Sequence, residues 1–342
     1  MRRNLVLDFS RGVAALGIVA FHIFATGDSL FGALFFFVDF FFVLSGFVLA
    51  PSLNKVDSTQ ALKEFIVKRA LRIFPMAISG ICFVVSIQLI VYARDIITRE
   101  KLSEGIDLSF STIVLNILLL QVFSLKSQLL LFPLWSLSAE WITNLAYGFL
   151  RVAKAKKLLF LIPFGVLMLI IGLTNSLSME MTSISISLGR CFYGFGVGLL
   201  CFHLFHKRIN SYVSSWFSLF VFPICLIQYS LYFFVGMNFL IVLPIGFGAI
   251  VLLLALTKES LSNVSSKIFA FFGRHSYGVY VWHVPMSNLL SIVENNLKTV
   301  SFISSPTSKF FLASILSVFA SSLVIKMFEK PIQKAVKSRL ND

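Results

Sequence analysis

The sequence predicts an all-α, polytopic membrane bundle of about ten transmembrane helices, with both termini in the cytoplasm. Hydrophobic residues make up 58% of the 342 residues, whereas charged residues make up only 13%. That charged share is about half that of an ordinary soluble domain, and the mean hydropathy is +0.91. Apolar runs long enough to cross a bilayer recur from end to end, so we expect a single integral membrane domain over residues 1–342.

The apolar runs place the expected spans in order along the chain, and most approach or exceed the ~20 residues that cross a bilayer. The first run resembles a signal peptide, but Asp8 and Arg11 interrupt it, so we expect an uncleaved helix. A further apolar segment, 110–125, is expected to lie at the outer interface or to re-enter the membrane. The spans are residues 10–28, 31–50, 73–93, 133–150, 158–175, 184–205, 212–235, 238–256, 276–293 and 308–326.

The distribution of positive charge sets the expected orientation, because cytoplasmic loops are enriched in Lys and Arg. With these spans, most of the 29 Lys and Arg residues fall on the side that holds both termini. The net charge of +14 therefore reflects topology and attraction to anionic lipids rather than nucleic-acid binding. The other side receives only Arg94, Arg99, Lys101, Lys126, Arg190, Lys298 and Lys309.

Two residues of the first span, Arg11 and His22, give the strongest indication of a functional site. Eleven helical residues rotate by roughly 1100°, about 20° past three full turns, so both side chains share one face about 16 Å apart along the axis. The residues between them carry no polar side chain. Ionisable groups inside a membrane cost roughly 2.5–3.5 kcal/mol each on insertion scales, and they usually mark function.

The first inner loop, the polar connection 51–72 before the third span, holds Arg69 and Arg72, which share a helix face because they are three residues apart. The guanidinium group offers fixed donors that suit phosphate oxygens. Two functions are compatible with this pair of arginines: contact with lipid headgroups, or binding of a phosphate-bearing ligand from the cytosol.

Asp39 and Glu140 are acidic residues within apolar segments. Asp39 must face a partner or a water-filled cavity, so it either pairs with an arginine or hydrogen-bonds an imidazole of another span. Glu140 suits binding of a hydroxyl-bearing substrate, proton transfer, or capping of a helix start. Gly46, together with Gly194 and Gly198, favours close helix packing.

The remaining polar and sulfur-bearing residues of the spans carry weaker signals. His283 is a deeply placed histidine of a kind that often hydrogen-bonds a neighbouring helix. The cysteines show no metal-type spacing, and no Walker loop, dinucleotide fingerprint or zinc pattern is present. We therefore expect no metal site. The cysteines are Cys82, Cys191, Cys201 and Cys225.

Taken together and in order, these motifs resemble the acyltransferase-3 family of integral membrane acyltransferases. Each motif alone is weak, but the set covers essentially the whole chain. The motifs are Leu7-Asp8-x-x-Arg11-Gly12-x-Ala14-Ala15-Leu16, Arg11-x10-His22, the segment Val38–Phe47, Arg69-x-x-Arg72 with Pro75, Leu134-Trp135-Ser136-Leu137-Ser138-x-Glu140, and Gly273-Arg274-x-Ser276-Tyr277 with Trp282-His283-x-Pro285.

The resemblance implies a bundle that moves acyl groups, mostly acetyl from acetyl-CoA, onto sugars of surface polysaccharides or their lipid-linked precursors. It also implies the stand-alone type, without an appended hydrolase-like domain, in a bacterial inner membrane. Acyl-CoA, the saccharide acceptor and membrane lipids are the expected partners. The chain departs from the family pattern at Met76–Ala77 and at Trp141–Asn144, so acceptor identity is the least constrained expectation.

The resemblance also assigns roles to the polar residues. Arg69 and Arg72, with Arg11, would hold the phosphates of the donor at the inner face. His22 would deprotonate an acceptor hydroxyl or carry the acyl group itself, and the sequence leaves both routes open. Asp39 and Glu140 complete the expected catalytic set. The residues expected to shape the acceptor side are Trp135, Ser138, Trp282 and His283.

Two other function classes are compatible with the residues alone. Intramembrane His, Asp and Glu also suit a proton-coupled transporter or flippase of a glycan or small solute, although no inverted repeat is evident. A non-catalytic scaffold or receptor would not need the face shared by Arg11 and His22. A transport assay without acyl-CoA tests the first class, and mutation of that face tests the second.

Overall fold

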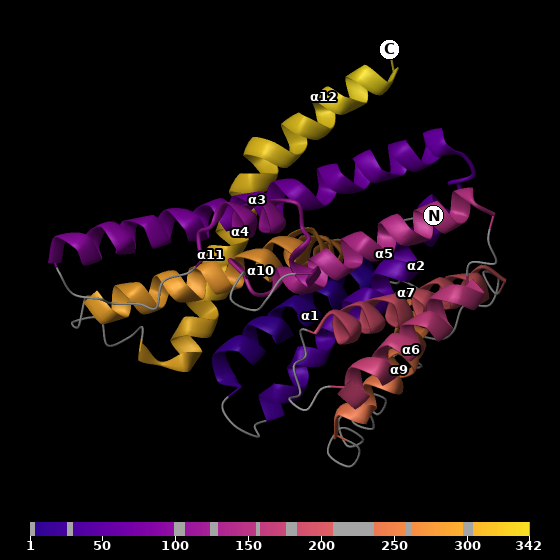
Figure 1. Cartoon of the computed structure of the whole chain (residues 1–342), viewed down its shortest axis with the longest axis horizontal. Coiled ribbons are helices and arrows are strands. Elements are labelled where there is room, and N and C mark those ends of the chain that lie inside the picture. The colour runs from indigo at the N-terminus through magenta and orange to yellow at the C-terminus, as the bar shows by residue number, and fades with distance from the viewer. Residues whose placement is uncertain are drawn as a thin grey trace. The chain divides into compact units, whose positions relative to one another are not determined.

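The computed structural model describes residues 4–25, 30–98, 107–123, 129–154, 158–175, 183–207, 236–257, 262–296 and 304–341. The regular elements in these ranges are all helices, which confirms the expected all-α class (Figure 1). The chain forms two compact units, which we describe separately. Unit 1 comprises Met1–Ile66 and Ala139–Tyr277, and unit 2 comprises Val67–Ser138 and Gly278–Asp342.

Membrane insertion is supported by six helices of the described residues that are long and apolar enough to cross a bilayer. They run over Leu5–Phe24, Phe31–Leu53, Thr59–Ile97, Ile184–Lys207, Phe239–Leu256 and Pro306–Val336. The expected spans 133–150 and 276–293 are helical as well, but they fall in helices that do not reach this hydropathy. The expected span 212–235 lies outside the described residues.

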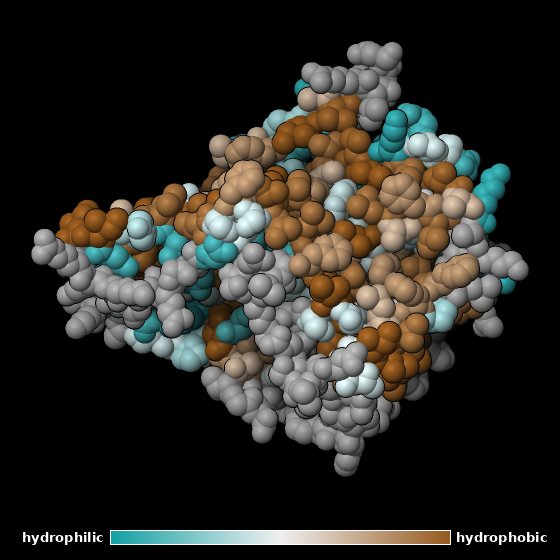
Figure 2. All heavy atoms as spheres, viewed as in Figure 1, coloured by the Kyte–Doolittle hydropathy of each residue, from teal (hydrophilic) through white to brown (hydrophobic). Residues whose placement is uncertain are grey.

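The surface of the described residues also suits contact with lipid. Hydrophobic residues cover most of the described surface visible in Figure 2, and hydrophilic residues form smaller patches. Large apolar side chains are highly exposed, among them Ile97 at 81% and Phe110 at 83%. A water-soluble protein rarely exposes apolar patches of this extent.

Unit 1 is built around one buried helix, α7 (Ile184–Lys207), which packs against α2 (Phe37–Leu53), α6 (Leu158–Asn175) and α9 (Leu243–Leu256). The first helix of the unit, α1 (Leu5–Phe24), begins where the side chain of Asn4 accepts a hydrogen bond from the backbone nitrogen of Leu7. Within the described residues, the other elements that lie wholly in this unit are η1 (Leu30–Phe36) and η5 (Gly236–Ile241).

Glycines let α2 and α7 pack backbone against backbone. A Cβ atom on Gly46 of α2 would collide with the backbone of Phe195, and one on Gly198 of α7 would collide with the backbone of Val43. Small residues allow this close approach between membrane helices. The expected packing role of Gly46 and Gly198 is therefore confirmed.

Unit 2 contains α4 (Phe110–Ile117), η2 (Gln121–Phe123), α11 (Pro306–Val324), the π-helical turn Ile325–Glu329 and α12 (Lys330–Asn341). With eight residues, α4 is about 12 Å long, too short to cross a membrane. This length agrees with the expectation that 110–125 does not span. After α4 the chain turns at Leu119, whose φ is 55°.

Three helices pass from one unit into the other: α3 (Thr59–Thr98), α5 (Leu134–Val152) and α10 (Asn263–Asn296). The 40 residues of α3 make a helix of about 60 Å, roughly twice the thickness of a hydrocarbon core. We expected a polar loop as far as residue 72, but the helix already begins at Thr59. Arg69 and Arg72 therefore lie on a continuous helix.

Candidate functional site

The expected pair of α1 lies on one unbroken helix, so Arg11 and His22 share a face. The Nδ1 atom of His22 lies 3.0 Å from the carbonyl oxygen of Ile18. Because a carbonyl oxygen only accepts hydrogen bonds, this contact places the ring proton on Nδ1 and the lone pair of a neutral imidazole on Nε2. The side chain of His22 also keeps an exposed surface. An oriented imidazole that a substrate can approach suits a general base or a nucleophile.

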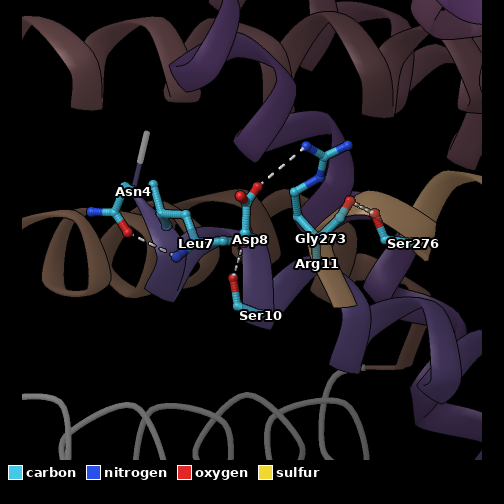
Figure 3. Close-up of polar contacts among 7 residues, drawn as sticks. All are labelled: Asn4, Leu7, Asp8, Ser10, Arg11, Gly273 and Ser276. Carbon is cyan, nitrogen blue, oxygen red and sulfur yellow. Dashed lines mark hydrogen bonds and ion pairs between the residues drawn. The ribbon is translucent and has the colours of Figure 1, made fainter. Parts of the chain in front are cut away.

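The surroundings of Arg11 bring two distant sequence motifs together (Figure 3). Asp8, one turn earlier on α1, has its Oδ1 atom 4.0 Å from Nη1 of Arg11, which makes a long ion pair. Gly273 of α10 lies directly against the side chain of Asp8, because a Cβ atom at Gly273 would collide with it. The carbonyl oxygen of Gly273 in turn accepts a hydrogen bond from Oγ of Ser276 at 3.0 Å.

Asp39 pairs with an arginine, which is one of the two outcomes expected for it. Nε of Arg190 donates to Oδ1 at 3.0 Å, and Nη2 donates to Oδ2 at 2.6 Å. Both side chains are buried, with 0% and 1% exposure, and the guanidinium lies 4.5 Å from the ring centroid of Phe35. Both oxygens of Asp39 are thus engaged by Arg190, and the alternative contact with an imidazole is not what the structure shows.

Sequence reasoning missed this role of Arg190, which we counted among the outer-side charges. The structure places it in the core of unit 1, with no exposed surface. A signal was available, because Arg190 and Asp39 are opposite charges in two apolar segments. Charged groups within a membrane usually pair with one another.

Glu140 meets α2. Its Oε1 atom accepts a hydrogen bond of 2.6 Å from Oγ of Ser45. Because α5 begins at Leu134, Glu140 lies in its second turn. The alternative that Glu140 caps a helix start is therefore wrong.

Arg72 of unit 2 also has an acidic partner that we did not expect. Its Nη1 atom donates to Oε1 of Glu329 at 2.8 Å, and Nε2 of Gln333 donates to the same oxygen at 3.1 Å. Glu329 is the last residue of the π-helical turn. Turns of this type are rare and are frequent at functional sites.

Comparison with known proteins identifies the family. The family model of the acyltransferase-3 type, described as an acyltransferase domain, matches residues 4–326. The chain belongs to the acyltransferase-3 family. The chain is also similar to "Protein 2 in picA locus" of Rhizobium radiobacter, with 30% identity over 159 residues, which is 43% of this chain and 81% of that protein. No solved structure matches significantly.

The family match confirms the expected resemblance and supports an acyltransferase embedded in a membrane. In this acyltransferase-3 chain the candidate residues fall in two groups. Unit 1 holds Arg11, His22, Asp39 and Glu140, and unit 2 holds Arg69, Arg72 and the four residues expected on the acceptor side. Glu329 lies just beyond the matched residues.

The four acceptor-side candidates of this acyltransferase-3 chain are all buried, with exposures of 3% for Trp135, 0% for Ser138, 6% for Trp282 and 0% for His283. Oγ of Ser138 accepts a hydrogen bond from the backbone nitrogen of Val122 at 3.1 Å, so this residue supports the turn after α4. Nδ1 of His283 lies 2.8 Å from a carbonyl oxygen of its own helix. The indole of Trp282 packs against the ring of Phe83 on α3, with 5.1 Å between the ring centroids.

Neither a metal centre nor a disulfide is found among the residues that the structure describes. Within those ranges no group of three or more His, Cys, Asp or Glu side chains is placed to hold a metal ion. Cys82, Cys191 and Cys201 are free thiols, and Cys225 lies outside the described residues.

Proposed function

We propose that this chain is a membrane O-acyltransferase that moves an acyl group, acetyl in the first instance, from cytosolic acyl-CoA to a sugar hydroxyl. The acceptor is a surface polysaccharide or its lipid-linked precursor, and the site of action is the bacterial inner membrane. The observation that carries the proposal is the face of α1 shared by Arg11 and His22, within a chain of the acyltransferase-3 family.

His22 performs the chemistry in this proposal. The hydrogen bond from Nδ1 to the carbonyl of Ile18 leaves the lone pair on Nε2. Nε2 accepts the proton of the acceptor hydroxyl while the oxygen of that hydroxyl attacks the thioester carbonyl. The carbon–sulfur bond then breaks, and the imidazolium returns the proton to the departing CoA thiolate. In the second route Nε2 attacks the thioester carbonyl itself, the carbon–sulfur bond breaks and the CoA thiolate leaves. The acyl-imidazolium then passes the acyl group to the acceptor hydroxyl, whose proton goes to the thiolate.

Donor binding is assigned to the arginines of α3. Arg69 and Arg72 share one helix face, and the side chain of Arg72 is 43% exposed. Arginine suits the phosphates of a polyanionic donor because its guanidinium forms charge-assisted, often bidentate, bonds to them. The opposite charges of the donor and this helix face favour docking from the basic, cytosolic side.

The experiment compares surface polysaccharide from cells that express the wild-type chain with polysaccharide from cells that express His22→Ala. We expect mass spectrometry to show the acetyl increment only for the wild type, at equal amounts of membrane-inserted protein. Retention of the acetyl groups with His22→Ala would reject the catalytic role of this imidazole. Transport of a labelled glycan by the purified protein without acyl-CoA would instead favour a flippase.

A further inference from the structure

The helix that follows α11 is amphipathic, and the proposed function does not use it. A π-helical turn and α12 continue α11 without a break, and we call residues 325–336 the C-terminal amphipathic segment. With 19 residues, α11 is about 29 Å long, enough to cross the hydrocarbon core of a bilayer. We therefore expect the C-terminal amphipathic segment to begin at the interface between membrane and water.

Three lysines follow one another at four-residue spacing along this segment. They are Lys326, Lys330 and Lys334, and the side chains of all three are exposed. Among the residues that the structure describes, none of these lysines has an acidic partner. Helical residues four apart lie one above the other on nearly the same face. The three lysines therefore form a basic stripe whose positive charge is not compensated within the described ranges.

An apolar stripe lies on the opposite side of the segment. Its members are Phe328, Ile332 and Val336, which are also four residues apart, and each comes two residues after a lysine of the basic stripe. Two residues of an α-helix rotate by about 200°, so the apolar stripe and the basic stripe face in nearly opposite directions. Phe328 is 49% exposed and Ile332 is 37% exposed, although both are large apolar side chains.

A third face of the segment is attached to α3. Glu329 is buried, and its Oε1 atom accepts hydrogen bonds from Nη1 of Arg72 at 2.8 Å and from Nε2 of Gln333 at 3.1 Å. The residues next to Glu329 in the sequence, Phe328 and Lys330, lie about 100° to either side of it around the helix. The contact with Arg72 thus fixes the rotation of the helix and leaves both stripes exposed, one on each side of α3.

This arrangement matches the layers of a membrane surface. An amphipathic helix with lysines on one face and large apolar side chains on the other lies in the plane of the interface, with its apolar face at the boundary of the acyl chains. The flexible stem of lysine lets its ammonium group reach the headgroup phosphates. Near an anionic leaflet, each lysine raises the affinity of such a segment about fivefold.

We propose that the C-terminal amphipathic segment is a lipid-binding surface, whose basic stripe binds the headgroups of anionic phospholipids while its apolar stripe enters the same leaflet. By the expected orientation, this leaflet is the cytoplasmic one. A soluble phosphate-bearing ligand would satisfy the lysines but would leave the apolar stripe in water, so the bilayer surface is the better match. The inference is independent of the proposed function, because it assigns a membrane contact rather than a step of acyl transfer.

The test is hydrogen–deuterium exchange of the full-length protein in nanodiscs. One set of nanodiscs contains phosphatidylcholine alone, and the other contains a mixture of phosphatidylcholine and anionic phosphatidylglycerol. We expect the backbone amides of the segment to exchange about tenfold more slowly in the anionic nanodiscs, because the lysines favour the docked state there. Salt at about 1 M should abolish the difference, since it shortens the screening length to about 3 Å.

A triple variant tests the basic stripe. Replacing Lys326, Lys330 and Lys334 together by glutamine should remove the dependence of exchange on lipid charge and leave KM for acetyl-CoA unchanged. The matched control replaces the same three lysines by arginine, which keeps the charges and should keep the lipid dependence. The exchange of α4, which carries none of these lysines, serves as an internal reference in every sample.

A single variant tests the apolar stripe. Ile332→Ser removes a large apolar side chain from the exposed face and keeps all three lysines. We expect faster exchange of the segment in both kinds of nanodisc, because apolar burial in the leaflet does not depend on lipid charge. Exchange as slow as that of the wild type would show that the apolar stripe does not enter the membrane.

Two further results would overturn the proposal. Equal exchange of the wild-type segment in the two lipid compositions would mean that the basic stripe does not bind anionic headgroups. Slower exchange on addition of CoA to phosphatidylcholine nanodiscs, with a raised KM for acetyl-CoA in the glutamine variant, would assign the lysines to a soluble phosphate ligand. The exchange measurement requires no acyl transfer, so a failure of the proposed function leaves this test intact.

Discussion

Arg72 of α3 and Glu329 of the π-helical turn form an ion pair, with 2.8 Å between Nη1 and Oε1. The side chain of Glu329 is nearly buried, at 9% exposure, whereas the side chain of Arg72 is 43% exposed. The acidic partner therefore anchors one edge of the arginine while part of its surface faces outward. Since surface arginines lose considerable side-chain freedom on binding a ligand, an anchored arginine is better prepared to bind a phosphate.

Replacing Arg72 should weaken use of the donor. If Arg72 binds the donor as proposed, Arg72→Ala removes its charge-assisted bonds to phosphate, so we expect KM for acetyl-CoA to rise about tenfold, with little change in KM for the acceptor. Initial rates in liposomes at varied acetyl-CoA measure the effect. Lys334→Ala is the matched control, because Lys334 is an exposed cation of α12. An Arg72→Ala enzyme with unaltered acetyl-CoA dependence would remove Arg72 from the donor site.

The buried pair of Asp39 and Arg190 should be essential for stability. Asp39→Asn leaves a charged guanidinium in an apolar core, so we expect the protein to lose about 3–5 kcal/mol of unfolding free energy. Replacing both residues together, with Asp39→Leu and Arg190→Met, should recover most of that loss, since no charge then remains buried. Chemical unfolding in detergent measures both variants. If Asp39→Asn unfolds like the wild type, the ion pair does not form in the membrane protein.

The contact between α2 and α7 predicts a sharp difference between two glycines. Gly46→Ala pushes a methyl group into the backbone of Phe195, so we expect a loss of about 1–3 kcal/mol or failure to accumulate in the membrane. Gly32→Ala is the control, since a Cβ atom there meets nothing within 4 Å. Fluorescence-detected size-exclusion chromatography of the two variants compares their folded yields. Equal yields would contradict the close backbone packing.

Asp107 should make the stability of the protein sensitive to acid. Hydrogen bonds from Thr112 and Ser109 hold the pKa of Asp107 below its ordinary value of 3.8. Because the folded pKa is the lower one, the stabilisation is complete above the ordinary value and disappears as the pH falls through the folded pKa. The unfolding temperature of Asp107→Asn should therefore fall less than that of the wild type between neutral pH and about pH 3. Parallel curves for the two proteins would refute this role.

The features that the sequence predicted well depend on short-range periodicity. Arg11 and His22 share a helix face because the ten residues between them are apolar and continue one uninterrupted helix. The all-helical class and the presence of helices long and apolar enough to cross a membrane followed from composition and from apolar run length. The predicted start of α3 was wrong. The polar residues before Arg72 are typical of a loop, but the helix begins at Thr59 and includes them.

The features that the sequence did not predict depend on partners far away in the chain. Arg190 meets Asp39 across 151 positions, and Arg72 meets Glu329 across 257. Helical periodicity gives the face of each residue but not which helix lies opposite.

The contact at Gly46 and Gly198 has a mechanical consequence. Two helices whose backbones touch cannot slide or rotate past each other without a steric collision, so α2 and α7 form a rigid pair. An opening that admits the proposed glycan acceptor would therefore have to move other helices around this pair. Asp39, Ser45 and Arg190 would keep their mutual spacing through each turnover, and the enzyme would meet every incoming sugar with the same fixed frame.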